Sequence, residues 1–340
     1  LIMSHFRSGW AVWSWLVCWS ASLQAQPLQR FEYNRPAMGT QFRLVLYAEN
    51  EPTAATAAEA AFNKVATLNA ALSDYLPESE LSQLSATAGK GQWVSVSDDL
   101  WKILVRSKQI AKASGSAFDP SIGSLSKLWR QAFRDKAFPP AKLVAEAKAT
   151  VNFRAIHLRK RDQAVQLDIA GIQLDLGGIA KGYTADVLLE LLEQQGIRHA
   201  LVDAGGDLSL GAPPPDRPAW QVACRQRNDK GQVVDQLLPL SERGIATSGD
   251  QYRFMEHKGK RYSHIIDPRS GYGITSRRQV TVIAPDGMTA DALASALSIV
   301  HYRKAKKILR KFKAGARILQ GDPGQEQQWE FHFPAAAGRN

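Results

Sequence analysis

The segment 175–186 carries the residue types of an anion-binding turn. It reads DLGGIAKGYTAD, in which an apolar run leads through Gly177 and Gly178 into a predicted helix. The unpaired N–H groups and the positive dipole end of a helix N-terminus favour an anion, and glycines let it approach the backbone closely. Lys181 lies in the first turn, where a cation opposes the helix dipole unless a negative group lies nearby. The pattern fits equally well an ordinary tight turn with a surface lysine.

Asp291 and Ser295 lie four residues apart in the stretch TADALASAL. On a helix this spacing places a carboxylate and a hydroxyl on one face, and both are oxygen ligands of the kind that Mg²⁺ prefers. The alternative is a first-turn aspartate that stabilises the helix dipole beside a small core serine. From this stretch alone the alternative is better supported.

His264, Asp267 and Arg269 lie within the segment YSHIIDPRSG. A histidine is the natural general base near neutral pH, and the Asp-Pro step predicts a turn that presents Arg269. A hydrogen-bonded structural histidine is the more common role for a lone histidine, so this segment by itself leaves both roles open.

The strands and helices that must position these residues alternate along the chain. Apolar residues recur with a period of two in strands and at helical spacing in helices. The predicted strands are 31–48 (a pair interrupted at 36–40), 156–176, 200–203, 208–210 and 280–283. The predicted helices are 53–72, 97–114, 142–149, 179–195, 290–300 and 302–313. These elements indicate an α+β fold in which antiparallel hairpins alternate with helix pairs.

One hairpin is predicted directly before the glycine turn. Val165, Leu167 and Ile169 alternate with polar residues, a turn falls at 170–171, and alternate apolar residues resume over 172–176. Two alternating runs that flank a short glycine turn are typical of a β-hairpin.

The composition is that of an ordinary globular protein. The chain has 340 residues, of which 44% are hydrophobic and 22% charged, so it is too apolar to stay disordered. Its length allows one large domain or two. No apolar run of about 18 residues follows the first few dozen positions, which excludes a polytopic membrane protein. Cys18 and Cys224 are the only cysteines, which excludes a disulfide scaffold and a Cys-rich metal site.

Residues 1–26 predict a secretory signal peptide. Arg7 supplies a positive charge, an apolar stretch runs from Trp10 to Leu23, and small residues near Ala25 offer a cleavage site. The alternative is an uncleaved membrane anchor, for which the stretch is short. Cys18 lacks the preceding small residue that lipidation needs. We therefore expect an exported or periplasmic protein, attached to the inner membrane if the segment is retained.

The formal net charge of +11 indicates an anionic partner. The segment 302–313 holds seven of the basic residues, and its apolar residues lie on one face of an amphipathic helix. No helix-turn-helix, zinc-finger or RNA-recognition signature accompanies it, so nucleic acid is not an expected partner. A solvated basic face is the simplest interpretation. The functional alternative is contact with an anionic membrane surface or an acidic target subunit.

Eight sequence blocks together resemble the ApbE family of FAD:protein FMN transferases, in the family's order and over essentially the whole mature chain. The blocks are AMGT (37–40), LSDYLPESEL (72–81), GSAFDP (115–120) with Trp129 after it, DLGGIAKGY (175–183), VDAGGD (202–207), ATSGD (246–250), HIIDPRSG (264–271) and ADALAS (290–295). A match of this extent is specific, whereas each block alone is a weak signal.

The resemblance implies a T-fold-like α+β enzyme over residues 27–340, with antiparallel hairpins and helix pairs around a ligand cleft. Such an enzyme binds FAD, moves its FMN moiety onto a Thr or Ser hydroxyl of a target protein, and releases AMP. The expected partner is a protein acceptor of the kind this family modifies, a flavin-carrying subunit of a membrane redox complex.

Matched position by position, the resemblance also implies roles for single residues. The flavin and adenine sites would be lined by Met38, Tyr75, Ala117, Phe118 and Asp119. Lys181 and the backbone near Ile265 would contact the diphosphate of FAD or its flanks. His264 matches the family's catalytic histidine, and we expect it to take the proton of the acceptor hydroxyl, oriented by Asp267 or a backbone group.

The implied metal is Mg²⁺, held by the carbonyl of Ala180, the carboxylate of Asp291 and the side chain of Ser295. The family usually has Thr at position 295. Serine keeps the hydroxyl but lacks the stiff β-branched rotamer, so weaker metal binding is expected.

Two other functions are compatible with the same residues. A water molecule in place of the protein hydroxyl would make the protein an FAD pyrophosphatase that gives FMN and AMP. A non-catalytic periplasmic flavin-binding protein is the second alternative, but such a protein needs neither His264 nor the Asp291–Ser295 pair.

Overall fold

The computed structural model describes residues 27–228, 230–249 and 253–333. The signal-peptide prediction for residues 1–26 lies outside this part of the chain. None of the helices in the described ranges combines the length and the apolar character that a bilayer-spanning helix requires.

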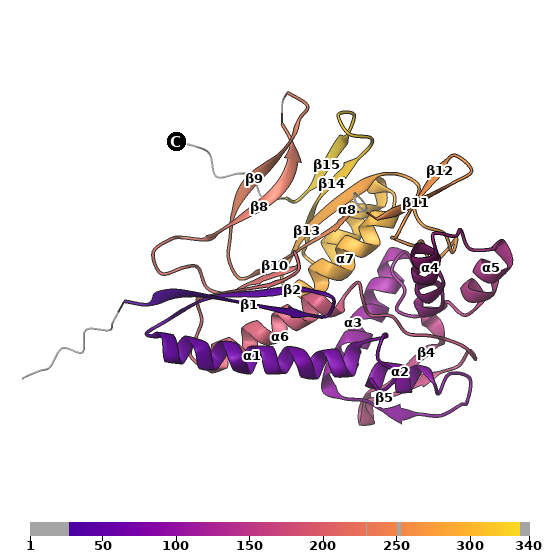
Figure 1. Ribbon diagram of the computed structural model, residues 1–340, viewed down its shortest axis with the longest axis horizontal. Helices are drawn as coiled ribbons and strands as arrows, with labels where there is room; N and C mark the ends of the chain where they lie inside the picture. The colour runs from indigo at the N-terminus through magenta and orange to yellow at the C-terminus, as the bar shows by residue number, and fades with distance from the viewer. Residues whose placement is uncertain (1–26, 229, 250–252, 334–340) are drawn as a thin grey trace, which may run out of the picture.

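An eight-stranded sheet forms the centre of the fold, in the order β1-β2-β6-β7-β10-β13-β14-β15 (Figure 1). Each neighbouring pair in it is antiparallel. Its strands are β1 (Gln29–Ala37), β2 (Thr40–Ala48), β6 (Ala200–Ala204), β7 (Leu208–Leu210), β10 (Arg243–Gly249), β13 (Arg278–Ala284), β14 (Gly315–Gln320) and β15 (Gln327–Phe331).

Three smaller sheets accompany it, in the orders β3-β5-β4, β8-β9 and β11-β12. Their strands are β3 (Val94–Ser95), β4 (Ile156–Arg159), β5 (Ala164–Leu167), β8 (Trp220–Arg227), β9 (Val233–Leu240), β11 (Phe254–His257) and β12 (Lys260–Ser263). The helices are α1 (Glu51–Leu72), α2 (Glu80–Ser85), α3 (Asp98–Ser114), α4 (Gly123–Asp135), α5 (Ala141–Ala149), α6 (Ala180–Gln194), α7 (Gly287–Ile299) and α8 (Tyr302–Lys311), with short 3-10 turns at Phe153–Ala155 and Lys160–Asp162.

Different elements pack on the two faces of the central sheet. Alternate residues of β2, among them Leu44 and Leu46, pack with α1 and α6. Val45 faces the other way and packs with the β8–β9 hairpin, including Cys224. In Figure 1, α1 and α6 lie below the β1–β2 end of the sheet and β8–β9 lies above it. Cys224 is 4% exposed, and burial raises the pKa of its thiol to about 11.

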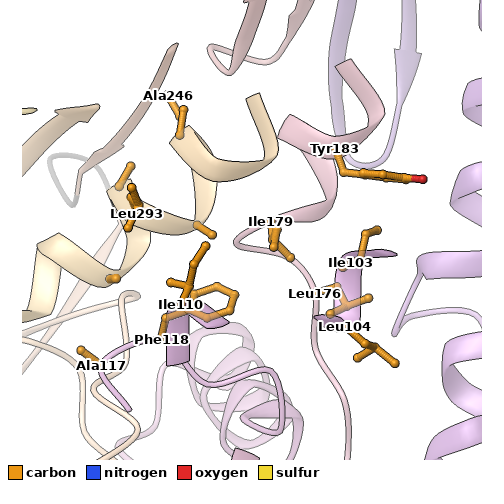
Figure 2. Close-up of a cluster of buried hydrophobic side chains, with 14 of the residues drawn as sticks. Ile103, Leu104, Ile110, Ala117, Phe118, Leu176, Ile179, Tyr183, Ala246 and Leu293 are labelled. Atoms are coloured by element: carbon orange, nitrogen blue, oxygen red, sulfur yellow. The ribbon is translucent and has the colours of Figure 1, made fainter. Parts of the chain in front are cut away.

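A third and larger hydrophobic cluster joins α2, α3, α7 and β13 to the segment that precedes α6. Figure 2 shows Phe118 among side chains of α3, α7 and that segment, including Ile110, Leu293 and Ile179. Phe118 is 7% exposed, so its loop is fixed by the core beneath it.

The α+β class and most predicted elements are confirmed. The β1–β2 pair and α1 form as expected, and α3 begins at the Ser97 cap, whose side chain accepts a hydrogen bond from the Leu100 amide. Gly115 ends α3 in the left-handed conformation, φ 65°, which glycine adopts at little cost.

The prediction of a β-hairpin over 165–176 is wrong. β5 pairs with β4 and β3 instead, and residues 172–176 run as an extended buried segment that touches another strand-like segment only at the Ile122–Gln173 bridge. The Leu174 amide donates to Ser85 Oγ at 3.0 Å and the Asp175 amide to the Pro120 carbonyl at 2.9 Å. The alternation of apolar residues therefore reflects burial between loops and α2.

Candidate active site

A cavity of about 310 Å³ lies where α4, α7, the turn before α6 and the loop after β12 meet. Figure 1 shows α4, α7 and the β11–β12 hairpin around this region. The cavity is lined by Asp74, Tyr75, Ala117, Phe118, Asp119, Ile122, Ser126, Trp129, Arg130, Phe133, Asp175, Gly177, Gly178, Ser248, Arg253, His264, Ile265, Ile266 and Ser295.

The glycine turn before α6 is built for close approach. Asp175 Oδ1 accepts a hydrogen bond of 2.7 Å from the Gly177 amide, which fixes the turn. A Cβ added to Gly178 would lie 2.8 Å from Ser295 Oγ, closer than a side chain there can tolerate. Glycine thus allows the Ser295 hydroxyl of α7 to lie against the turn, at the wall of the cavity.

Two buried carboxylates and a partly exposed lysine lie behind this turn. Asp291 and Asp207 are 5% and 4% exposed, and the Lys181 ammonium forms an ion pair with Asp207. Burial lowers the pKa of Lys181, but the charges of Asp291 and Asp207 outweigh it and leave that pKa above its ordinary value. These carboxylates supply the negative charge that a lysine in the first turn of a helix requires.

Asp291 is an oxygen donor with excess negative charge around it. Burial, followed by the charge of Asp207, raises the pKa of Asp291 to about 7, although Lys181 acts in the opposite direction. Two buried carboxylates thus face one ammonium. The Ala180 carbonyl, at the first residue of α6, accepts a hydrogen bond of 2.8 Å from Thr184 Oγ1. A carbonyl, a carboxylate and the Ser295 hydroxyl form a donor set that fits a hard divalent cation.

The side chain of His264 borders the same cavity. Its Nδ1 lies 3.1 Å from the carbonyl oxygen of Arg253. Because a carbonyl only accepts, Nδ1 is the donor in this contact, and a neutral imidazole would then carry its lone pair on Nε2. A backbone carbonyl thus helps to orient the His264 ring. Asp267 instead forms two hydrogen bonds of 2.8 Å with the Arg269 guanidinium.

Arg130 joins two walls of the cavity and was not anticipated from the sequence. Its guanidinium pairs with Asp74, lies 3.9 Å from Asp175 Oδ2, and stacks 4.2 Å from the centre of the Tyr75 ring. It therefore connects the loop after α1 to the glycine turn. No local pattern marks it, because its partners lie far away in the sequence.

The predicted site residues fall into two groups. Those that line the cavity are Tyr75, Ala117, Phe118, Asp119, His264, Ile265 and Ser295. Ala180, Lys181 and Asp291 lie behind the cavity wall, around the start of α6. Met38 also lies away from the lining, in the β1–β2 turn, with its Sδ 3.6 Å from Thr184 Oγ1.

Asp119 has a supporting role within its loop. Its carboxylate accepts hydrogen bonds from the amide and hydroxyl of Ser121, at 3.0 and 2.6 Å, and from the Phe153 amide at 3.1 Å. These bonds hold the backbone that presents Ala117 and Phe118 to the cavity.

Comparison with known proteins agrees with this fold. The structure superposes on the flavin transferase ApbE from Vibrio cholerae with a TM-score of 0.80 and 24% identity, over 90% of this chain and 98% of that one. The ApbE protein from Thermotoga maritima gives a TM-score of 0.78 with 26% identity, over 89% and 97% of the two chains. The fold is thus that of the flavin transferases.

Sequence similarity extends over the same region. The chain is 36% identical over 298 residues to the FAD:protein FMN transferase of Treponema pallidum, which covers 83% of this chain and 82% of the relative. A Klebsiella pneumoniae protein of the same name is 33% identical, over 86% and 85% of the two chains. The ApbE family profile matches residues 38–319. The chain belongs to the ApbE family.

Proposed function

We propose that this protein transfers the FMN moiety of FAD to a Thr or Ser hydroxyl of an acceptor protein and releases AMP. The observation that carries the proposal is one cavity bordered by His264, by the glycine turn and by Ser295. That arrangement offers a base, a backbone cradle for phosphate and an oxygen ligand within one binding site. The relatives named as FAD:protein FMN transferases support the same reaction.

The metal site of this proposal consists of the Ala180 carbonyl, the Asp291 carboxylate and the Ser295 hydroxyl. Mg²⁺ bound there would neutralise charge on the FAD diphosphate and hold it in place. Among the described residues no group of three or more His, Cys, Asp and Glu could hold a metal. The proposed site contains only one such residue, so substrate oxygens and water would complete its coordination.

The other steps of the proposed transfer depend on residues of this chain. The acceptor hydroxyl attacks the phosphorus on the flavin side of the diphosphate, and its proton passes to Nε2 of His264. The bond between that phosphorus and the bridging oxygen breaks, and AMP leaves with the oxygen. The loops of Tyr75 and Phe118 enclose the cofactor, and positioning supplies most of the rate enhancement in phosphoryl transfer of this kind.

Mass spectrometry of candidate acceptors tests the proposal. The protein without residues 1–26 is incubated with FAD, Mg²⁺ and flavin-carrying subunits of membrane redox complexes, and the acceptor is examined for the mass of one FMN less water. A matched acceptor with its target Thr replaced by Val is the control. FMN and AMP without a protein adduct would indicate a pyrophosphatase, and intact FAD would indicate a flavin-binding protein. Either outcome contradicts the transferase.

We further infer an exported protein that acts at a membrane surface. Seven basic side chains in α8 and just after it are exposed. They are Arg303, Lys304, Lys306, Lys307, Arg310, Lys311 and Lys313. Within the described ranges none of them forms an ion pair with a carboxylate, and α8 has no acidic residue. Such a face is attracted to anionic lipid.

Vesicle sedimentation tests this contact. We expect binding to phosphatidylglycerol vesicles that weakens with salt, and little binding to phosphatidylcholine vesicles. A Lys306→Glu/Lys307→Glu variant is expected to bind the anionic vesicles more weakly. Equal binding to both lipids would remove the proposal.

A further inference from the structure

A second cavity, of about 240 Å³, opens beside the cavity of the candidate active site and is lined mostly by basic side chains. Lys127, Arg130 and Arg134 lie on one face of α4, because their spacing of three and four residues is that of a helix turn. Arg253 comes from the loop before β11. We call these four residues the cationic patch; Asp74 and Tyr75 complete the lining.

The patch is continuous with the proposed active site. Asp74, Tyr75, Arg130 and Arg253 line both cavities, so a molecule in one borders the other. The backbone of Arg253 also accepts the hydrogen bond that orients His264. One residue therefore links the patch to the base that must meet the acceptor hydroxyl.

Most of the positive charge in the patch is not neutralised by the fold. Arg130 pairs with Asp74, but Lys127 bonds the neutral side chain of Gln173 at 2.6 Å. Arg134 bonds the neutral side chain of Gln131. Neither Lys127 nor Arg134 forms an ion pair in the part of the chain that the structure describes, and both are exposed.

We infer that the cationic patch docks an acidic stretch of the acceptor polypeptide beside its target hydroxyl; this rests on the proposed transfer of FMN. The acceptor must reach Nε2 of His264, and the patch lies on the wall that carries the Arg253 carbonyl. The diphosphate of FAD is assigned to the glycine turn and Ser295, which leaves these cations for the second substrate. Complementary charge of this kind steers encounter and fixes register.

Peptide binding tests the docking without any turnover. The probe is a rhodamine-labelled peptide in which a threonine follows a run of aspartates, compared with the same peptide carrying asparagines. Fluorescence anisotropy is measured on the protein with FAD bound, at low and high salt. The variants are Lys127→Glu/Arg134→Glu and the milder Lys127→Gln/Arg134→Gln, and Lys306→Glu/Lys307→Glu on α8 is the control with the same change of net charge.

We expect the aspartate peptide to bind about tenfold more tightly than the asparagine peptide at low salt, and this preference to fade with salt. The charge-reversed patch is expected to lose the preference, with the glutamine variant in between, while the α8 control and all FAD affinities stay within about twofold of the unmodified protein. Equal binding of the two peptides overturns the inference. So does an equal loss in the α8 control, or a parallel loss of FAD affinity, which would assign the patch to the nucleotide.

The outcome is separable from that of the proposed function. FMN transfer to the aspartate peptide is scored independently by mass spectrometry. Transfer without any charge preference in binding refutes the docking alone, whereas selective binding with no FMN on any acceptor refutes the transferase.

Discussion

The backbone amide of Gly182, in α6, donates a hydrogen bond of 3.1 Å to Asp291 Oδ2, in α7. It joins the two helices at the point where the chain concentrates its buried charge. The bond holds one carboxylate oxygen of Asp291 and leaves the other for the proposed cation. Four predictions concern this junction and the base opposite it.

Replacing Asp291 with Asn should abolish stabilisation by Mg²⁺. An amide cannot replace the charge of the carboxylate, so the metal loses its single anionic protein ligand in the proposed site. The unmodified protein should gain about 2.7 kcal/mol of unfolding free energy when Mg²⁺ is present at about 100 times its Kd. The measurement is thermal melting with increasing Mg²⁺, which needs no substrate. An equal rise in melting temperature for the Asn variant would show that Mg²⁺ binds elsewhere.

Replacing Gly182 with Ala should separate α6 from α7. A Cβ there would lie 2.2 Å from the carbonyl oxygen of Gly287, and backbone cannot give way cheaply. We expect a loss of roughly 1–3 kcal/mol in the free energy of unfolding, measured in urea. The control is Gly249→Ala, where the nearest atom lies at an ordinary 3.5 Å. Similar losses in both variants would argue against the steric explanation.

Replacing His264 with Ala should slow FMN transfer by about 10²–10⁴-fold at saturating FAD, because the acceptor hydroxyl loses its base. Single-turnover flavinylation of an acceptor measures the chemical step, and His264→Gln tests whether a polar side chain of similar size suffices. A loss much below a hundredfold would remove the assignment of His264 as general base.

Asp186 makes stability depend on pH. Its carboxylate accepts hydrogen bonds from the Gly287 and Met288 amides, at 2.7 and 2.8 Å, and burial raises its pKa from 3.8 to about 6. Because the folded pKa is the higher one, the protonated form stabilises the fold. This contribution is complete below about pH 4 and is lost as the pH rises through about 6.

Urea unfolding of Asp186→Asn across this range measures the effect. As the pH falls from about 7 to about 4, the unfolding free energy of the unmodified protein should rise relative to that of the Asp186→Asn variant. The expected rise is up to about 3 kcal/mol. The comparison variant is Asp162→Asn. Arg159 lowers the pKa of the exposed Asp162 from its ordinary value of 3.8, so its difference should change little above about pH 4 and in the opposite direction below it. A pH-independent difference for Asp186→Asn would contradict the prediction.

Local signals in the sequence predicted several elements correctly, although α2 and α4 were not predicted. The alternation of Phe42, Leu44 and Leu46 marks the face of β2 that packs with α1 and α6, and the Ser97 and Gly115 caps mark the ends of α3. Over 172–176 the same kind of alternation led to the wrong prediction of a β-hairpin. This segment is buried by α2 and by distant loops, so its apolar residues alternate as in a strand although it does not pair as one.

The site likewise contains residues that sequence motifs predicted and residues that they did not. His264, Ser295 and the glycine turn belong to sequence motifs, and the fold brings them to one cavity. Arg130 and Arg253 belong to no such pattern. Their positions depend on how α4 and the loop before β11 approach each other, and contacts between segments so far apart in the chain leave no periodic trace in either one.

Because Cys224 is buried, the rate at which its thiol reacts measures local opening of the structure. A thiol reagent dissolved in water reaches it when the β8–β9 hairpin lifts from the sheet or the chain unfolds, and the raised pKa slows reaction further. The rate of alkylation at this residue therefore reports how often that hairpin detaches. The same burial shields the thiol from exchange with other disulfides for as long as the hairpin stays packed on the sheet.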